Sequence, residues 1–201
     1  MPKPHKFDKF LKAMLTMFGI GYSKYAPGTL ASFVTCVIYY LIYMYGWKLV
    51  GFSLYYNHTY VVWFLIIITI SSINLINDRS FRDKFAKLFK KRELADKISD
   101  PKEIVIDEFI GQSIPIISYW YFNFGVANDS FKNASSFFYF NSFWAWIITS
   151  FILFRFFDIL KPYPINIIDK KMKNGLGIML DDIIAGIYST IAGFIIWTLW
   201  F

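Results

Sequence analysis

Five stretches of this chain are apolar over nearly the length of a lipid bilayer, and this feature limits its possible folds more than any other. They cover residues 29–49, 60–76, 104–122, 140–160 and 183–201. A helix needs roughly 20 mostly apolar residues to span the hydrocarbon. The composition agrees, because 56% of the 201 residues are hydrophobic and the mean hydropathy is +0.42. We therefore predict an all-α integral membrane bundle of about five spans, forming a single domain over residues 1–201.

The N-terminal residues predict an amphipathic helix. From Phe7 to Phe18 apolar residues recur at helical spacing, while charged residues fall on other faces. We expect this helix to lie in the membrane interface, with packing against the bundle as the alternative. The helix and the Gly- and Pro-containing loop after it form a predicted arm over residues 1–26. Lys9 and Lys12 interrupt the apolar stretch, which argues against a cleavable signal peptide.

The basic residues predict the topology. Of the 21 Lys and Arg residues, only Lys48 and Lys132 fall on the outer side when the N-terminus is placed in the cytoplasm. The longest basic connection, residues 77–103, then lies inside, as the positive-inside rule requires. The net charge of +7 is therefore explained by topology and does not call for a nucleic-acid partner. The single cysteine, Cys36, cannot form an internal disulfide.

Carboxylates gather at one membrane depth on three predicted spans. They are Asp107 and Glu108 in the first turn of the third span, Asp158 in the last turn of the fourth, and Asp181 and Asp182 at the start of the fifth. Ionisable groups at membrane depth are costly and usually face partners, metal or substrate. Carboxylates that converge repel one another unless a cation neutralises them. Mg²⁺ prefers oxygen ligands and often bridges carboxylates to phosphate.

Two basic residues flank one of these acids. Arg155 lies three residues before Asp158 and Lys161 lies three residues after it, so the three share a helix face. A guanidinium can bind two phosphate oxygens at once, and an ammonium acts as a point charge. Acids for metal beside bases for phosphate favour phosphoryl chemistry. The alternative for Arg155 and Lys161 is a role as inside-facing anchors.

Glycines near the predicted helix starts fit an anion site. Gly28 and Thr29 come where the first span begins, so free backbone N–H groups and the helix dipole can face a phosphate there. Gly175 and Gly177 precede the acidic pair of the fifth span and would let the backbone approach a ligand. The alternative for the acids is structural, since a helix dipole favours carboxylates at its N-terminus.

The third span has two further features. Pro115 would clash with the carbonyl of Gly111, which predicts a kink one turn from the acids. Gly111, and Gly186 in the fifth span, can also be read as sites where helices pack closely.

The residues that several other phosphatase mechanisms require are missing from the predicted acidic layer. His5 and His58 lie away from the acidic layer, which argues against a phosphohistidine route. Cys36 is not followed by an Arg-terminated phosphate loop, and the chain has no P-loop pattern. In-line attack by metal-activated water or by a carboxylate remains, and water is favoured because no phospho-aspartate fingerprint is present.

Three blocks of sequence resemble the phosphatidylglycerophosphatase A family. They are GYSKYAPGTLASF at 21–33, DPKEIVIDEFIGQ at 100–112 and FRFFDILKPYPINIIDKKMKNGLGIMLDDIIAG at 154–186. The blocks cover about 60 residues and follow the family's order. Ala31 and Lys24 depart from the usual family residues, and the basic connection looks longer than usual.

The resemblance implies a bacterial inner-membrane enzyme that hydrolyses phosphatidylglycerophosphate to phosphatidylglycerol and phosphate with Mg²⁺, with its N-terminus and active site cytoplasmic. It implies a lipid substrate and surrounding membrane lipids, but no obligate protein partner. The family's acids map onto Asp100, Asp107, Glu108, Asp158, Asp181 and Asp182, with Asp169 as a further match of less obvious role. Its phosphate-side positions map onto Arg155, Lys161, Gly28 and Thr29.

Two rival functions compete with this reading. A cation transporter would spread its acids through the membrane depth, whereas here they lie in one layer. A purely structural membrane subunit gives no reason for Arg155, Asp158 and Lys161 to share a face beside four other acids.

Overall fold

The computed structural model describes residues 6–50, 59–78, 102–120, 136–172 and 174–200, and these residues are organised as helices. The helices are α1 (Lys6–Leu15), the 3-10 helix η1 (Met17–Tyr22), α2 (Pro27–Val50), α4 (Thr59–Asn77), α6 (Ile106–Trp120), α7 (Ser136–Leu160), α8 (Ile165–Lys171) and α9 (Gly175–Trp200). The predicted all-α membrane bundle is confirmed.

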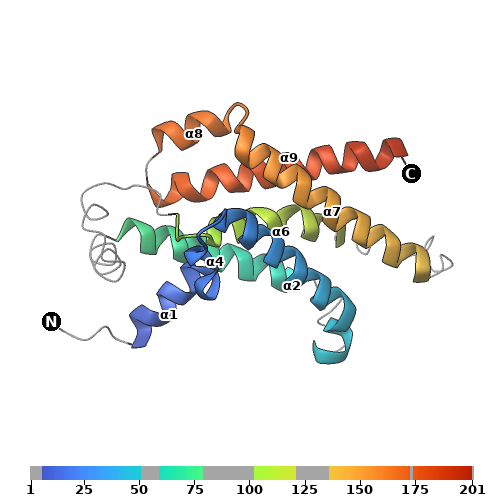
Figure 1. The fold of residues 1–201 in the computed structure, drawn as a ribbon, viewed down its shortest axis with the longest axis horizontal. Coiled ribbons are helices and arrows are strands. Elements are labelled where there is room, and N and C mark those ends of the chain that lie inside the picture. The colour runs from blue at the N-terminus through green and yellow to red at the C-terminus, as the bar shows by residue number, and fades with distance from the viewer. Residues whose placement is uncertain (1–5, 51–58, 79–101, 121–135, 173, 201) are drawn as a thin grey trace.

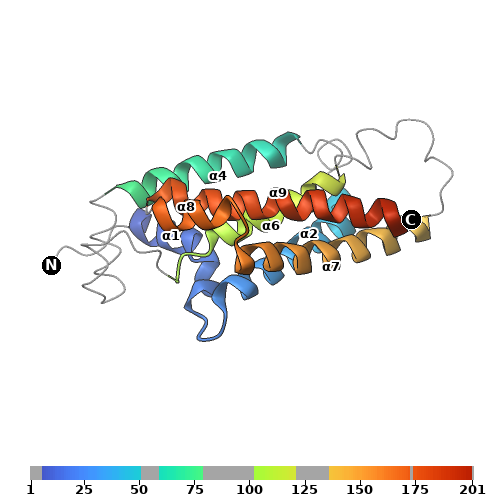
Figure 2. The same ribbon diagram turned by 90° about the horizontal axis from the view of Figure 1, so that it is seen from above.

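The five longest helices lie side by side and alternate in direction (Figures 1 and 2). The starts of α2, α6 and α9 and the ends of α4 and α7 meet at one end of the bundle, which we call the polar end. Two contacts fix this arrangement. The N–H of Gly175 donates to Asn77 Oδ1 at 2.9 Å, and Lys161 Nζ donates to Asp181 Oδ2 at 2.8 Å.

Among the residues that the structure describes, four helices are long and apolar enough to cross a membrane. These candidate spans are Pro27–Tyr45, Tyr60–Asn77, Phe143–Leu160 and Gly175–Leu199. Large apolar side chains such as Phe33, Ile67 and Ile195 are exposed on their outer faces, as lipid-facing residues would be. The third predicted span corresponds to α6, of which 15 residues are described.

Helices α6 and α9 cross at very close range. A Cβ atom added to Gly186 would overlap the carbonyl oxygen of Gly111, and one added to Gly111 would lie 2.7 Å from the carbonyl oxygen of Asp182. The close-packing interpretation of both glycines therefore holds, and the crossing sets Asp182 beside the first turns of α6.

Helix α6 continues through Pro115. Because proline has no N–H, the Gly111 carbonyl has no helical donor four residues on, and it faces Gly186 instead. The Pro115 carbonyl accepts a hydrogen bond of 2.8 Å from Trp146 Nε1 in α7. The proline thus sits where two neighbouring helices contact α6.

Helix α9 begins eight residues before the predicted start of the fifth span, at Gly175. Two asparagines cap it, because Asn174 Oδ1 accepts from the Gly177 N–H at 2.8 Å and Asn77 Oδ1 accepts from the Gly175 N–H. The prediction that Asp181 and Asp182 open this span is wrong, since they lie in the second turn of the helix.

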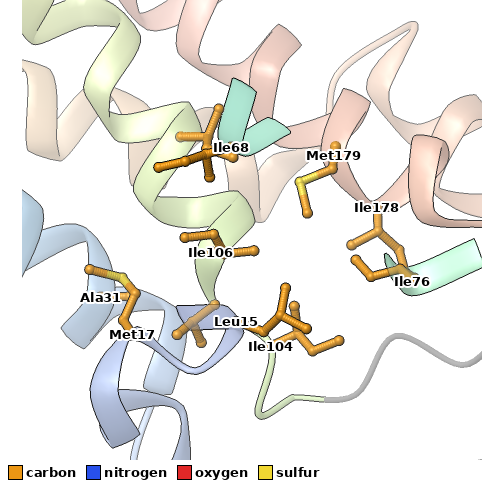
Figure 3. Close-up of a cluster of buried hydrophobic side chains, with 11 residues drawn as sticks. Leu15, Met17, Ala31, Ile68, Ile76, Ile104, Ile106, Ile178 and Met179 are labelled. Atoms are coloured by element: carbon orange, nitrogen blue, oxygen red, sulfur yellow. The ribbon is translucent and has the colours of Figure 1, made fainter. Parts of the chain in front are cut away.

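The N-terminal segment packs on the bundle by its apolar side. Leu15 and Met17 join a buried cluster with Ile104, Ile178 and Met179 (Figure 3). The Val105 N–H also donates to the Leu15 carbonyl at 3.0 Å. The end of this amphipathic helix therefore packs on the rest of the protein, which was the alternative prediction. The same contacts hold the start of α6 in place.

Candidate functional site

Three carboxylates meet at the polar end of the bundle. Asp107 and Glu108 lie in the first turn of α6, and Asp182 lies in the second turn of α9. One oxygen from each can be chosen so that all three lie within 4.8 Å of one another. Asp107 and Asp182 are buried. We call these residues the carboxylate triad.

Backbone packing brings the triad together. Gly111 lies one helical turn after Asp107 and contacts the backbone of Asp182, so a larger residue at 111 would push the two carboxylates apart. The N-terminal dipole of α6 favours Asp107 and Glu108. Asp182 lies beyond the first turn of its own helix, where the dipole contributes little, so the structural explanation offered for acids at helix starts does not cover it.

Gly28 makes room for one member of the triad. A Cβ atom added to Gly28 would overlap Glu108 Oε1. Gly28 and Thr29 are the second and third residues of α2, where backbone N–H groups have no helical acceptor. The other carboxylate oxygen, Glu108 Oε2, is buried without a hydrogen-bond partner. The start of α2 thus faces the Glu108 carboxylate, one oxygen of which has no hydrogen-bond partner.

Arg155 and Asp158 of α7 lie next to the triad. Arg155 Nη1 is 2.7 Å from Asp158 Oδ2, and it donates to Ser32 Oγ in α2 at 3.5 Å. The charge of Asp158 acts on both Glu108 and Asp182. Arg155 Nε is buried without a partner. The guanidinium therefore keeps an unused donor close to the carboxylates.

Lys161 is shared between two other acids. Its ammonium lies 2.8 Å from Asp181 Oδ2 and 3.0 Å from Asp169 Oδ1. Although burial opposes its charge, these two ion pairs raise the pKa of Lys161 above its ordinary value. Its backbone is left-handed, with φ of 44°, a conformation that costs a non-glycine residue energy. The contact with Asp169 gives that acid a structural partner.

Gly175 and Gly177 are surrounded by protein rather than open to a ligand. A Cβ atom at Gly175 would lie 2.8 Å from the Ile73 carbonyl oxygen, and one at Gly177 would overlap the Met172 carbonyl oxygen. Both N–H groups are used by asparagine caps. Close packing of α9 against its neighbours, rather than approach to a ligand, explains these glycines.

The predicted acids fall into three groups in the structure. Asp107, Glu108 and Asp182 form the triad, Asp158 pairs with Arg155, and Asp181 pairs with Lys161. Asp100 lies outside the described residues.

The triad fits a divalent metal ion. It offers hard oxygen donors from two helices. One of these donors, Glu108 Oε2, is buried and has no hydrogen-bond partner. Three carboxylates this close would repel one another in a poorly solvated setting, and a cation removes that cost. Oxygen-only donor sets of this kind suit Mg²⁺, Ca²⁺ or Mn²⁺.

Two polar residues near this site have no role that the sequence alone predicts. Ser32 is buried and contacts Arg155. Gln112 is fully buried four residues after Glu108, and neither its amide nitrogen nor its amide oxygen has a hydrogen-bond partner. Ser32 lies four residues after Gly28, and Gln112 lies four residues after Glu108, so helical spacing alone places each on the same face as a predicted site residue.

Comparison with known proteins finds a matching family model and relatives that carry phosphatase names. The family model described as Phosphatidylglycerophosphatase A matches residues 13–197. A Phosphatidylglycerophosphatase A of Haemophilus influenzae is 58% identical over 53 residues, which cover 26% of this chain and 32% of that relative. A protein of Bacteroides thetaiotaomicron named "Putative phosphatidylinositol-3-phosphatase" is 30% identical over 92% of this chain and 93% of its own length.

A third relative is the Phosphatidylglycerophosphatase A of Escherichia coli, which is 28% identical over 86% of this chain and 74% of its own length. No solved structure matches this chain.

Proposed function

This chain belongs to the phosphatidylglycerophosphatase A family, and from that premise we propose that it hydrolyses phosphatidylglycerophosphate to phosphatidylglycerol and inorganic phosphate in an Mg²⁺-dependent reaction. The observation that carries the proposal is the carboxylate triad beside an arginine at one end of an apolar bundle. Such an arrangement suits a substrate whose tails stay in lipid while its charged end meets polar side chains.

Asp107, Glu108 and Asp182 would hold the metal ion, with Asp158, Asp181 and Asp100 as the further candidates. Mg²⁺ bound there would neutralise charge on the phosphoryl oxygens and lower the pKa of a water molecule. Glu108 Oε2, which is buried and unpartnered, gives the donor set an oxygen that is free to coordinate.

The residues around the triad would position the phosphate. The Arg155 guanidinium has an unused buried donor, and the N–H groups of Gly28 and Thr29 at the start of α2 add two more. Lys161 would be the second cation of the site. Its ammonium is paired with Asp181 and Asp169, so at least one of these ion pairs must break before it can bind a phosphate.

The reaction itself is an in-line displacement at phosphorus. A water oxygen forms the new bond to phosphorus, a carboxylate of the site takes the proton of that water, and the bond from phosphorus to the head-group oxygen breaks. A proton then returns to the departing alkoxide, which becomes the free hydroxyl of phosphatidylglycerol. Arg155 stabilises the charge on the phosphoryl oxygens while the geometry changes.

We place the site on the cytoplasmic side of a bacterial inner membrane. The support is the charge distribution, because the predicted topology puts 19 of the 21 Lys and Arg residues on the same side as the acids, in the N-terminal arm, at the end of the fourth span and in the connections after the second and fourth spans.

The Bacteroides relative favours a second candidate substrate. It matches nearly the whole chain, and its name indicates a phosphoinositide phosphatase. Phosphatidylinositol 3-phosphate is also a lipid phosphomonoester with hydroxyl groups beside the phosphate. Phosphate release from both lipids, measured in parallel at equal surface concentration, decides between the two by their ratio of kcat/KM.

The triad is tested by removing one charge at a time. Asp182→Asn and Asp107→Asn should each abolish turnover while leaving membrane insertion intact. Asp78→Asn removes an exposed carboxylate at the end of α4 and serves as the control, with wild-type activity expected. Retained turnover in both triad variants would remove the proposed metal site.

A further inference from the structure

The burial of Gln112 costs the folded protein free energy. Its side chain is fully buried, and both polar atoms of the amide lack hydrogen-bond partners. A buried polar group without a partner costs roughly 1–3 kcal/mol. An apolar side chain of similar volume would fill the same space without that cost. A polar residue in such a place suggests that a ligand completes its hydrogen bonds.

Two further polar side chains lie at the same level of the bundle. Helices α2 and α6 run in the same direction from the polar end, and Gly28 of α2 contacts Glu108 of α6. One turn further along each helix, on the same faces, come Ser32 and Gln112. Ser32 accepts from Arg155 Nη1, and the buried Arg155 Nε has no partner. We call Ser32, Gln112 and Arg155 the inner polar layer.

Within this layer, Ser32 and Gln112 lie one helical turn further from the polar end than Gly28 and Glu108, while the Arg155 guanidinium also reaches Asp158 beside the triad. Four residues of helix rise by about 6 Å. If the terminal phosphate lies at the triad and the tails lie in the bilayer, the part of the head group between them falls at this depth. In phosphatidylglycerophosphate that part carries a hydroxyl group, on the carbon next to the one that bears the terminal phosphate. A hydroxyl both donates and accepts, as does the Gln112 amide.

We propose that Gln112 binds the head-group hydroxyl beside the scissile phosphate, which makes it a specificity-determining residue for hydroxyl-bearing lipid phosphomonoesters. The inference rests on the proposed function. It implies discrimination against lipids such as phosphatidic acid, whose phosphate has no neighbouring hydroxyl. A site built to bond a hydroxyl rejects an analogue that lacks it, because its buried polar groups are then left unpaired.

The test uses two lipids that differ by one oxygen atom. They are phosphatidylglycerophosphate and its analogue with 1,3-propanediol in place of the head-group glycerol, which lacks only the central hydroxyl. We expect the wild-type protein to prefer the hydroxyl lipid in kcat/KM by about 10-fold or more. Gln112→Met should lower kcat/KM for the hydroxyl lipid by about 10- to 100-fold and leave the propanediol lipid unchanged. Ser118→Ala, elsewhere on α6, is the control and should change neither.

Thermal unfolding adds a readout that separates binding from structure. Removing an unsatisfied buried amide should raise the Tm of Gln112→Met or leave it unchanged. Equal loss of activity on both lipids in Gln112→Met, or a wild-type protein that cleaves both equally, would overturn the inference while the proposed function stands. Phosphate release from neither lipid by the wild-type protein would refute the proposed function and the inference together.

Discussion

Replacing Gly111 by alanine should damage the triad through the helix crossing that builds it. The new methyl carbon would lie 2.7 Å from the Asp182 carbonyl oxygen and 2.7 Å from a ring carbon of Phe154. Ordinary van der Waals contact begins near 3.4 Å, so each neighbour stands about 0.7 Å too close. The first neighbour is helix backbone and the second is fully buried, so α6 and α9 must separate.

The separation moves Asp182 relative to Asp107 by a comparable distance. Mg²⁺ requires ligands at about 2.0–2.1 Å in nearly octahedral geometry, so the shift would disrupt a shared coordination site. Displacement by about 1 Å can cost about 100-fold in rate. We expect kcat to fall by about 10- to 100-fold, whereas overpacking lowers the free energy of unfolding by only about 1–3 kcal/mol.

The assay measures phosphate release at saturating lipid over a range of Mg²⁺ concentrations, together with thermal unfolding in the same detergent. Gly193→Ala is the matched control on α9. Its new carbon would lie 3.2 Å from the Trp146 ring, which needs to move by only a few tenths of an ångström. The control should keep the wild-type rate. A Gly111→Ala variant with the wild-type rate and Mg²⁺ response would refute the reasoning.

Two further substitutions test the phosphate group and the fold. Arg155→Lys keeps the positive charge but loses the planar guanidinium, so kcat for phosphate release should fall by about 100-fold, and a rate near wild type would remove Arg155 from the phosphate site. Asn77→Ala removes the cap on the Gly175 N–H, so the free energy of unfolding should fall by about 1 kcal/mol. Asn74→Ala, an exposed change one turn earlier on α4, should leave it unchanged, and an equal loss in both variants would contradict the capping role.

The fold class could be predicted because apolar length and charge are properties of the chain itself. The spans that match α2, α4 and α7 were placed within a few residues, since lipid-facing helices must be apolar along their length. The start of α9 was misplaced because glycines usually signal a loop. In the structure Gly175 and Gly177 are helical, as tertiary packing and two asparagine caps outweigh their low helix propensity.

The depth of the acids could also be predicted, but not their partners. Residues three or four apart on one helix are visible in sequence, so the contact between Arg155 and Asp158 was accessible. The pairing of Lys161 with Asp181 and Asp169 joins residues that lie after α7, in α8 and in α9. Helix α8 lies between the fourth and fifth predicted spans, where the sequence predicts only a connection. Side-chain contacts of this kind depend on the packing of separate helices, which periodicity does not reveal.

The central claim is tested most directly by phosphate release from phosphatidylglycerophosphate by the purified, detergent-solubilised protein, first with Mg²⁺ and then with EDTA. The proposal predicts release that EDTA stops and that added Mg²⁺ restores. No release from a well-folded preparation, or release that EDTA leaves unchanged, would contradict it.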